Sequence, residues 1–121
     1  MVMEEKITAE RQSWNTDAEA GLILSMGDDS EILKQQVISG RAELWHFDGE
    51  TVDVYTIVRR EGSELVVCCL EGHGAKAVVP MMQEAAKRAG CKTMRAHTKR
   101  LGLSRMFPDW QLKEYVFEKV L

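Results

Sequence analysis

Hydrophobic residues in the first third of the chain recur with the spacing of an α-helix. Much of residues 8–26 is predicted to be helical, with Thr16 placed as an N-cap and Glu19 three residues later. A second helix is predicted after Ser30, which can cap it, and Gly40 is placed to end it. Its apolar stripe consists of Ile32, Leu33, Val37 and Ile38.

The hydrophobic period then changes to two residues, as expected of β-strands. The segments RAELWHFDG and TVDVYTIVRRE alternate apolar and polar side chains, and Asp48-Gly49 between them is a strong hairpin signal. The segment EGSE predicts the next turn. LVVCCLE is continuously apolar, which is typical of a central strand buried on both faces of a sheet. Three strands joined by short turns are therefore predicted.

The segment after Gly72-His73-Gly74 regains the helical period. Pro80 is tolerated in a first turn, so we expect the regular helix to begin near Val78–Pro80 and to end at Gly90. A strand CKTMRAH, a short helix or turn RLGLSRMF and a last strand WQLKEYVFEKV follow. The predicted order is α-α-β-β-β-α-β-α-β. We therefore expect an α/β fold with a mixed, mostly antiparallel sheet flanked by helices, in a single domain over residues 1–121.

The composition is that of an ordinary soluble globular protein, with 121 residues of which 45% are hydrophobic and 29% are charged. No stretch approaches the roughly 18 consecutive apolar residues of a membrane helix. The acidic start MVMEEKITAE does not resemble a signal peptide, so we expect a cytoplasmic protein without a membrane partner. Cys68, Cys69 and Cys91 show no metal-ligand spacing, and no metal site is predicted.

Charge is distributed unevenly along the chain. The net charge is −3, yet residues 85–108 contain 7 Lys or Arg and no acidic residue. A basic segment on an acidic protein indicates a local anion site, and a solvated basic face is the alternative. No aromatic residues are interleaved with the charges as on a nucleic-acid surface, so nucleic acid is not an expected partner. The candidate anion ligands are Lys99, Arg100 and Arg105.

The glycine-rich turn at residues 72–74 is a candidate phosphate site. A helix N-terminus offers unpaired backbone amides and a partial positive charge, and glycine lets the backbone approach a phosphate closely. A tight turn without a ligand is the alternative, because a Gly-x-Gly pair alone is a weak signal. The candidate phosphate-binding residues are Gly72, His73, Gly74, Ala75 and Lys76.

The segment ELVVCCLEGHGAKAVVPMMQEAAKRAGCKTMRAHTKRLGL resembles the central strand, pyrophosphate loop, long helix and next strand of the GNAT superfamily of N-acetyltransferases. RLGLSRMFPDWQLKEYVFEKVL resembles the family's closing helix and last strand, so the resemblance covers about residues 28–121. The short loops are similar to those of small phage- and prophage-encoded members. The resemblance implies direct transfer of an acetyl group from acetyl-CoA to an amine of a small molecule or a protein.

The resemblance also implies where the cofactor lies. In this fold the central strand and the next strand splay apart, and the thioester arm lies against exposed strand backbone, here around Val67, Cys69 and Leu70. His97 falls where the family often has a polar contact to the cofactor. The basic segment would then hold the remaining phosphate of coenzyme A.

Two positions depart from the family's motifs. The loop motif is Arg/Gln-x-x-Gly-x-Gly/Ala, and its first position falls on Cys69 or Glu71, depending on whether Gly72 or Gly74 is its first glycine. The tyrosine that often serves as general acid falls at Arg105. These departures favour a second hypothesis, a catalytically degenerate GNAT-like binding or structural protein related to phage. An unrelated small α/β adaptor is the third hypothesis.

Direct acetyl transfer needs a base that takes the proton of the amine. The candidate bases are Glu43, His46, Asp53 and Glu71. Imidazole exchanges a proton near neutral pH, but His46 is also placed as a half-buried structural histidine in an amphipathic strand. Cys69 as a nucleophile is an alternative that burial would disfavour. A homodimer could form through a last strand that contains Tyr115, Val116 and Phe117.

Overall fold

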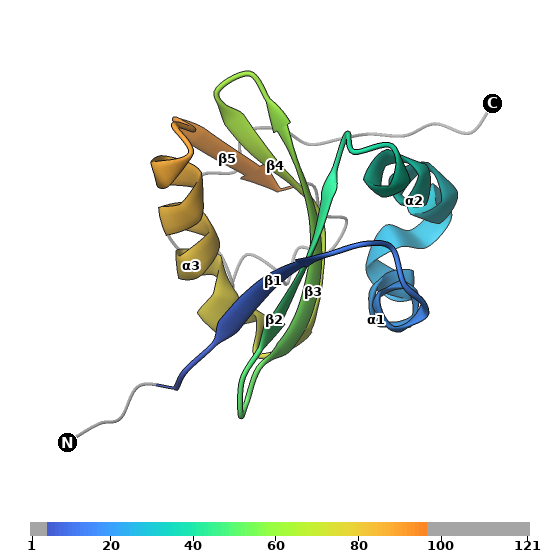
Figure 1. Ribbon diagram of the computed structural model, residues 1–121, viewed down its shortest axis with the longest axis horizontal. Coiled ribbons are helices and arrows are strands. Elements are labelled where there is room, and N and C mark those ends of the chain that lie inside the picture. Colours follow the sequence, from blue (N-terminus) through green and yellow to red (C-terminus); the bar gives the residue numbers. More distant parts are fainter. Residues whose placement is uncertain (1–4, 97–121) are drawn as a thin grey trace.

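A computed structural model describes residues 5–96 of the chain (Figure 1). Its elements are, in order, β1 (Thr8–Gln12), α1 (Thr16–Met26), a short 3-10 turn (Gly27–Asp29), α2 (Ser30–Ile38), β2 (Glu43–Asp48), β3 (Asp53–Glu61), β4 (Glu64–His73), α3 (Ala75–Arg88) and β5 (Thr93–Ala96). The five strands form one sheet in the order β1-β2-β3-β4-β5. β4 and β5 are parallel, and the other neighbours are antiparallel. The predicted mixed, mostly antiparallel sheet flanked by helices is confirmed.

The helices form a layer on each face of the sheet. Figure 1 shows α1 and α2 on one face and α3 on the other. No helix within residues 5–96 is long and apolar enough to cross a membrane. The βαβ connection from β4 through α3 to β5 provides the parallel pair of the sheet, as predicted.

The segment Thr8–Gln12 is a strand, so the prediction of helix from residue 8 is wrong there. It pairs antiparallel with β2, from Thr8 opposite Asp48 to Gln12 opposite Leu44. Four of its five residues are exposed, so it lacks the alternation of apolar residues that reveals a strand. The α1 helix begins later and is capped by Asn15, whose side-chain oxygen accepts a hydrogen bond from the Ala18 amide at 2.9 Å.

The α2 helix also differs in detail from the prediction. Ser30 is its first residue and not its cap, because the 3-10 turn leads directly into the helix. Leu33 is buried, whereas Ile32 and Ile38 are 58% and 59% exposed. Gly40 follows the helix with φ +81°, as expected of a residue that ends one.

Both predicted hairpins are confirmed. Asp48 pairs with Asp53 across the first turn, and the Gly49 amide donates to the Val52 carbonyl at 2.8 Å. The second turn joins β3 to β4, with Glu61 opposite Glu64. Short connections of this kind keep sequential strands adjacent in the sheet.

The α3 helix begins at Ala75, earlier than the predicted start at Val78–Pro80. Pro80 therefore lies inside the helix, where it has no N–H to donate to the Lys76 carbonyl. The strong amphipathic character of the segment offsets this loss, since Val78 and Met82 are buried against the sheet.

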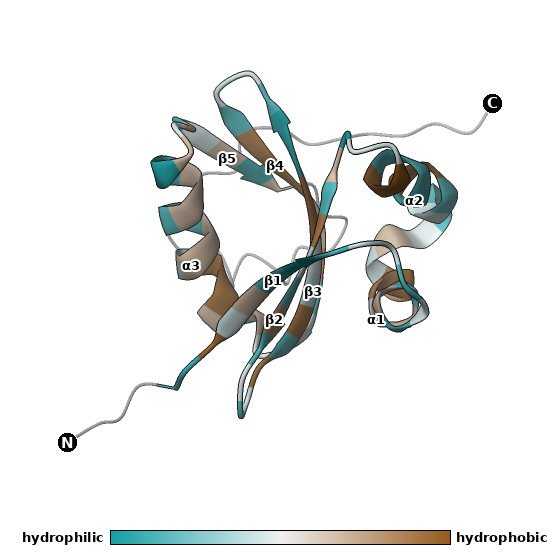
Figure 2. Cartoon of the chain, in the orientation of Figure 1, coloured by the Kyte–Doolittle hydropathy of each residue, from teal (hydrophilic) through white to brown (hydrophobic). Residues whose placement is uncertain are grey.

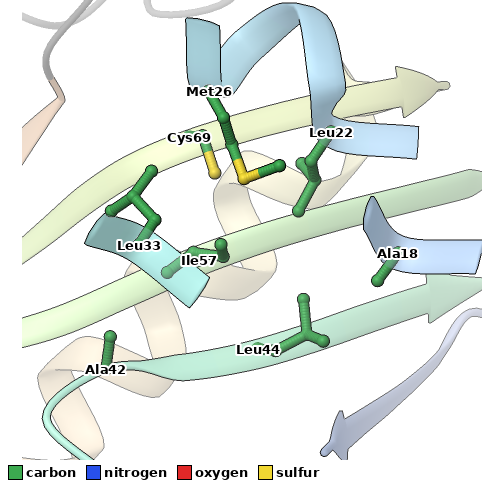
Figure 3. Close-up of a cluster of buried hydrophobic side chains, with 8 residues drawn as sticks. All are labelled: Ala18, Leu22, Met26, Leu33, Ala42, Leu44, Ile57 and Cys69. Atoms are coloured by element: carbon green, nitrogen blue, oxygen red, sulfur yellow. The ribbon is translucent and has the colours of Figure 1, made fainter. Parts of the chain in front are cut away.

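Apolar side chains form one cluster on each face of the sheet. Figure 3 shows the cluster under α1 and α2, in which Ala18, Leu22 and Met26 of α1 lie over Leu44, Ile57 and Cys69 of the strands. The cluster under α3 includes residues from β3 and β4. Figure 2 shows hydrophobic stretches in the middle of these strands, while the outward side of α3 carries hydrophilic residues. Both faces of β4 are therefore covered, as its continuous apolar run predicts.

Candidate functional site

An open hollow of about 520 Å³ lies on the face of the sheet that α1 covers. It is formed by the first half of α1, by β2, and by the ends of β3 and β4 that meet at the glycine turn. Its lining residues are Asp17, Ala20, Gly21, His46, Asp53, Tyr55, Glu71, Gly72 and His73. Polar and ionisable side chains therefore gather at one end of the sheet face that α1 covers.

Sheet register aligns three of these side chains in a row across three strands. His46 on β2 is opposite Tyr55 on β3, and Tyr55 is opposite Glu71 on β4. Directly opposite residues in an antiparallel pair have Cβ atoms about 5 Å apart. The row therefore places His46 and Glu71, two of the predicted bases that are 25 residues apart in the sequence, on one face of the sheet with Tyr55 between them.

His46 is held in a defined orientation. Its Nε2 lies 2.7 Å from Oδ1 of Asp53, the next predicted base. Its ring stacks on Tyr55 with ring centres 4.3 Å apart and an angle of 13° between the planes. In the tautomer whose Nε2–H donates a hydrogen bond to Asp53, Nδ1 carries a lone pair that can accept a proton. The pair can therefore act as a base supported by a carboxylate.

Glu71 connects β4 to the last turn of α1. Its Oε2 accepts a hydrogen bond from the Ser25 amide at 3.0 Å. The Ser25 hydroxyl donates to the Leu70 carbonyl at 3.1 Å. These two bonds fix α1 against β4 at the edge of the hollow.

Tyr55 and Gly21 contribute to the hollow, although neither is among the residues predicted from the sequence. A Cβ atom on Gly21 would lie 2.9 Å from Cδ2 of Tyr55, so glycine is what allows the ring to lie against the helix. Burial raises the pKa of Tyr55, and the negative charges of Asp53, Asp17 and Asp48 raise it further. Side chains alternate between the two faces along β3, so Tyr55 lies on the same face as Asp53. This alternation could have identified Tyr55 from the sequence.

No protein-family model and no curated protein sequence matches the chain. Two solved structures are similar to it in fold. One is a ribosomal-protein-alanine N-acetyltransferase from Brucella melitensis biovar Abortus 2308, with a TM-score of 0.56 and 13% identity over 93% of this chain and 100% of that chain. The other is glucosamine-6-phosphate N-acetyltransferase from Arabidopsis thaliana, with a TM-score of 0.54 and 9% identity over 93% of this chain and 98% of that chain.

The chain has the fold of the GNAT N-acetyltransferases. A likeness at this level of identity shows the fold alone. The similarity to phage-encoded members of the family stays a prediction.

In this GNAT fold both glycines of the turn pack against protein backbone. Gly72 has φ +140°, and a Cβ there would lie 2.1 Å from the Asp53 carbonyl oxygen. Gly74 has φ +80°, and a Cβ there would lie 2.7 Å from the Thr51 carbonyl oxygen. The close approach of β4 to β3 and its hairpin loop therefore accounts for the Gly-x-Gly pair without a ligand.

The N-terminus of α3 nevertheless has the features of an anion site. Gly74 is its N-cap and makes no side-chain capping bond, and its first turn has no acidic residue. By contrast, α1 has a capping Asn15 and two acidic residues in its first turn. Ala75 and Lys76 begin α3, so their amides point out of the helix end, and Lys76 adds a positive charge.

The backbone of β4 changes its pairing beside the predicted thioester arm. A bulge places Ile57 opposite Cys69 and Val58 opposite Val67, so Cys68 is the extra residue. The described pairing with β5 covers Glu64–Val67 and ends there. The Cys69 carbonyl accepts a bond of 2.7 Å from the Thr56 hydroxyl, which is itself buried.

The side chain of Cys69 lies in the core under α1 and α2, with only 5% of the residue exposed. Burial raises the pKa of its thiol to about 12. A thiolate is therefore strongly disfavoured, which argues against Cys69 as a nucleophile. Val67 is buried on the opposite face, under α3, with Leu70 partly buried beside it.

Glu43 lies at the far end of β2 and does not line the hollow. Its carboxylate makes an ion pair of 3.2 Å with Arg11 of β1. His73 lines the hollow, as does Glu71. The remaining predicted residues lie outside the part of the chain that the structure describes: His97, Lys99, Arg100, Arg105, Tyr115, Val116 and Phe117.

Proposed function

We propose that the protein is an N-acetyltransferase that transfers an acetyl group from acetyl-CoA to an amine bound in the hollow. The observation that carries the proposal is the His46–Asp53 pair, which supplies a supported base within the hollow of a GNAT fold. Fold alone does not imply activity, so the proposal rests on the chemistry of these side chains.

The described residues fit acetyl-CoA at two places. Ala75 and Lys76 at the uncapped, acid-free start of α3 would hold a phosphate group. The backbone of β4 at Cys68–Leu70, beyond the described pairing with β5, would lie along the thioester arm. When bound, acetyl-CoA would supply an acetyl thioester with a thiolate leaving group.

The side chains of the hollow would prepare the amine for attack. His46 Nδ1 accepts the proton that the amine loses, and Asp53 stabilises the resulting imidazolium through the bond to Nε2. Tyr55 holds the imidazole plane by stacking. Because its pKa is raised, Tyr55 is a weak proton donor and is assigned this positioning role.

The departures from the family's motifs support one competing function. A GNAT-like binding protein without chemistry would have the same fold, and the glycine turn is explained by packing alone. The two functions differ in whether acetyl-CoA is consumed.

Release of free thiol from acetyl-CoA in the presence of an amine panel tests the proposal. We expect turnover that depends on both the amine and His46. Absence of thiol release for every amine, with the protein folded and acetyl-CoA at millimolar concentration, would contradict the enzyme and favour the binding protein.

A further inference from the structure

The side chains that line the hollow carry mainly negative charge. Three carboxylates enter from three different elements: Asp17 from α1, Asp53 from β3 and Glu71 from β4. None of the nine residues that line the described hollow is Lys or Arg. Asp53 is engaged by His46 and one oxygen of Glu71 by the Ser25 amide, so Asp17 and the second oxygen of Glu71 supply the negative charge that remains for a ligand.

Tyr55 lies between His46 and Glu71 in the row across the hollow, and the charges of Asp53 and Asp17 act on it. Its pKa is raised by burial first and then by the charges of Asp53, Asp17 and Asp48. The carboxylate charges that disfavour the negative phenolate stabilise a positive charge placed beside the ring. Glu19 lies in the same first turn of α1 but does not line the hollow.

The hollow requires a residue in α1 that is unfavourable for a helix. Glycine in a helix is less favourable than alanine by about 1 kcal/mol, and Gly21 is what admits the Tyr55 ring. Two further bonds from Ser25 hold the helix next to Glu71. Asp17, Tyr55 and Glu71 are thus fixed around one open space, which distinguishes them from acidic residues scattered on a surface.

We infer that the hollow selects a small aliphatic amine that carries a second ammonium group, the diamine and polyamine class. One nitrogen lies next to His46, where a proton can be removed. The other lies toward Asp17, whose carboxylate faces it. An amine that carries a carboxylate or phosphate is repelled by the same charges. The inference rests on the proposed function in taking this amine as the acetyl acceptor, but binding of the amine does not require acetyl-CoA.

Calorimetry with three probes of equal length isolates the second charge. The probes are 1,5-diaminopentane, 5-amino-1-pentanol and 5-aminopentanoic acid, which end in a cation, a neutral hydroxyl and an anion. We expect the diamine to bind about fivefold more tightly than the alcohol, as for a partly exposed ion pair, and the amino acid to bind most weakly. Added salt should reduce the preference for the diamine.

Two variants test whether the preference for the diamine over the alcohol arises in the hollow. Asp17→Asn should reduce the preference for the diamine over the alcohol to about twofold or less, because its ion pair is lost. Glu19→Gln removes the same charge from the same turn and should leave the preference unchanged. Thermal unfolding followed by circular dichroism checks that both variants fold.

Equal affinity for the diamine and the alcohol, or tighter binding of the amino acid, would overturn the inference. So would an equal effect of both variants. Failure of the proposed function looks different: the diamine would bind with the stated preference, but no thiol would be released from acetyl-CoA. Turnover of neutral or anionic amines in preference to diamines would keep the enzyme and overturn the assigned substrate class.

Discussion

His46 and Glu43 are side chains of one strand, and the sequence proposed both as bases. The structure separates them: His46 contacts Asp53 in the hollow, whereas Glu43 is paired with Arg11 away from it. The difference follows from strand alternation together with the position of α1. Strand alternation can be predicted from the sequence, but the position of α1 depends on the packing of elements that are distant along the chain.

Replacement of the two candidate bases gives a matched test. We expect His46→Gln to lower kcat by a factor of about 10² to 10⁴, the usual contribution of general base catalysis. Glu43→Gln should leave kcat unchanged, because Glu43 does not line the hollow. Thiol release under saturating substrates measures both. Equal losses in the two variants would contradict the assignment of His46.

Cys69 predicts how stability depends on pH. Its folded-state pKa is raised from 9.0 to about 12, so the folded protein holds the thiol proton more tightly than the unfolded chain. The corresponding stability is fully present below pH 9 and is lost as the pH rises toward 12. Each pH unit in this range should lower the free energy of unfolding by up to about 1.4 kcal/mol.

Urea unfolding at several pH values, for the native protein and for Cys69→Ala, measures this contribution. The variant loses some packing at all pH values but should lose the thiol-dependent slope above pH 9. Parallel curves for the two proteins across that range would show that Cys69 does not titrate as its burial requires.

At the scale of elements, the helices and strands whose hydrophobic pattern reflects burial could be predicted from the sequence. The two hairpins, the buried β4 and the amphipathic α3 are of this kind. β1 was missed because it lies at the edge of the described sheet with almost all its side chains exposed, so backbone pairing alone defines it. The start of α3 was misplaced because tertiary packing outweighs the effect of Pro80.

The candidate site was only partly predictable for the same reason. The polar residues of β2–β4 were visible, but Gly21 and Asp17 enter the hollow through the packing of α1. The Gly-x-Gly turn was read as a phosphate cradle, and the structure gives each glycine a neighbour in β3 or in its hairpin loop. Packing alone therefore accounts for the two glycines, and the contact that we propose for a phosphate is with Ala75 and Lys76, which follow.

The α3 helix provides a matched test of that contact. Lys76→Glu places a negative charge in the first turn and should weaken acetyl-CoA binding about tenfold or more, since both the lost charge and the new one act on a phosphate. Lys87→Glu makes the same change in the last turn, far from the proposed contact, and should have little effect. Calorimetry measures both, and equal losses would place the phosphate elsewhere.

Gly21→Ala tests how α1 shapes the hollow. Alanine favours the helix by about 1 kcal/mol, but its Cβ would lie 2.9 Å from the Tyr55 ring. We expect the ring to move into the hollow, so that amine affinity falls while the protein still unfolds cooperatively. Unchanged affinity for 1,5-diaminopentane would show that the contact between helix and ring does not define the binding space.

At the scale of the whole molecule, two faces of one sheet have different roles. The face under α1 carries the row of His46, Tyr55 and Glu71, while α3 covers the other face and begins next to the end of β4. The β4 strand joins both, since its backbone runs from the bulge at Cys68 to the turn before α3. An amine that lies along the row from His46 toward Glu71 would therefore reach a thioester that lies along β4.

Amide chemical shifts in heteronuclear NMR spectra during an acetyl-CoA titration test this arrangement most directly. We predict saturable shifts that are largest for Ala75, Lys76 and Cys68–Leu70, with smaller changes at His46. Shifts confined to the opposite end of the sheet, around the β3–β4 turn, would contradict the proposed binding site. Spectra that do not change at millimolar acetyl-CoA would contradict the central claim that this GNAT fold uses the cofactor.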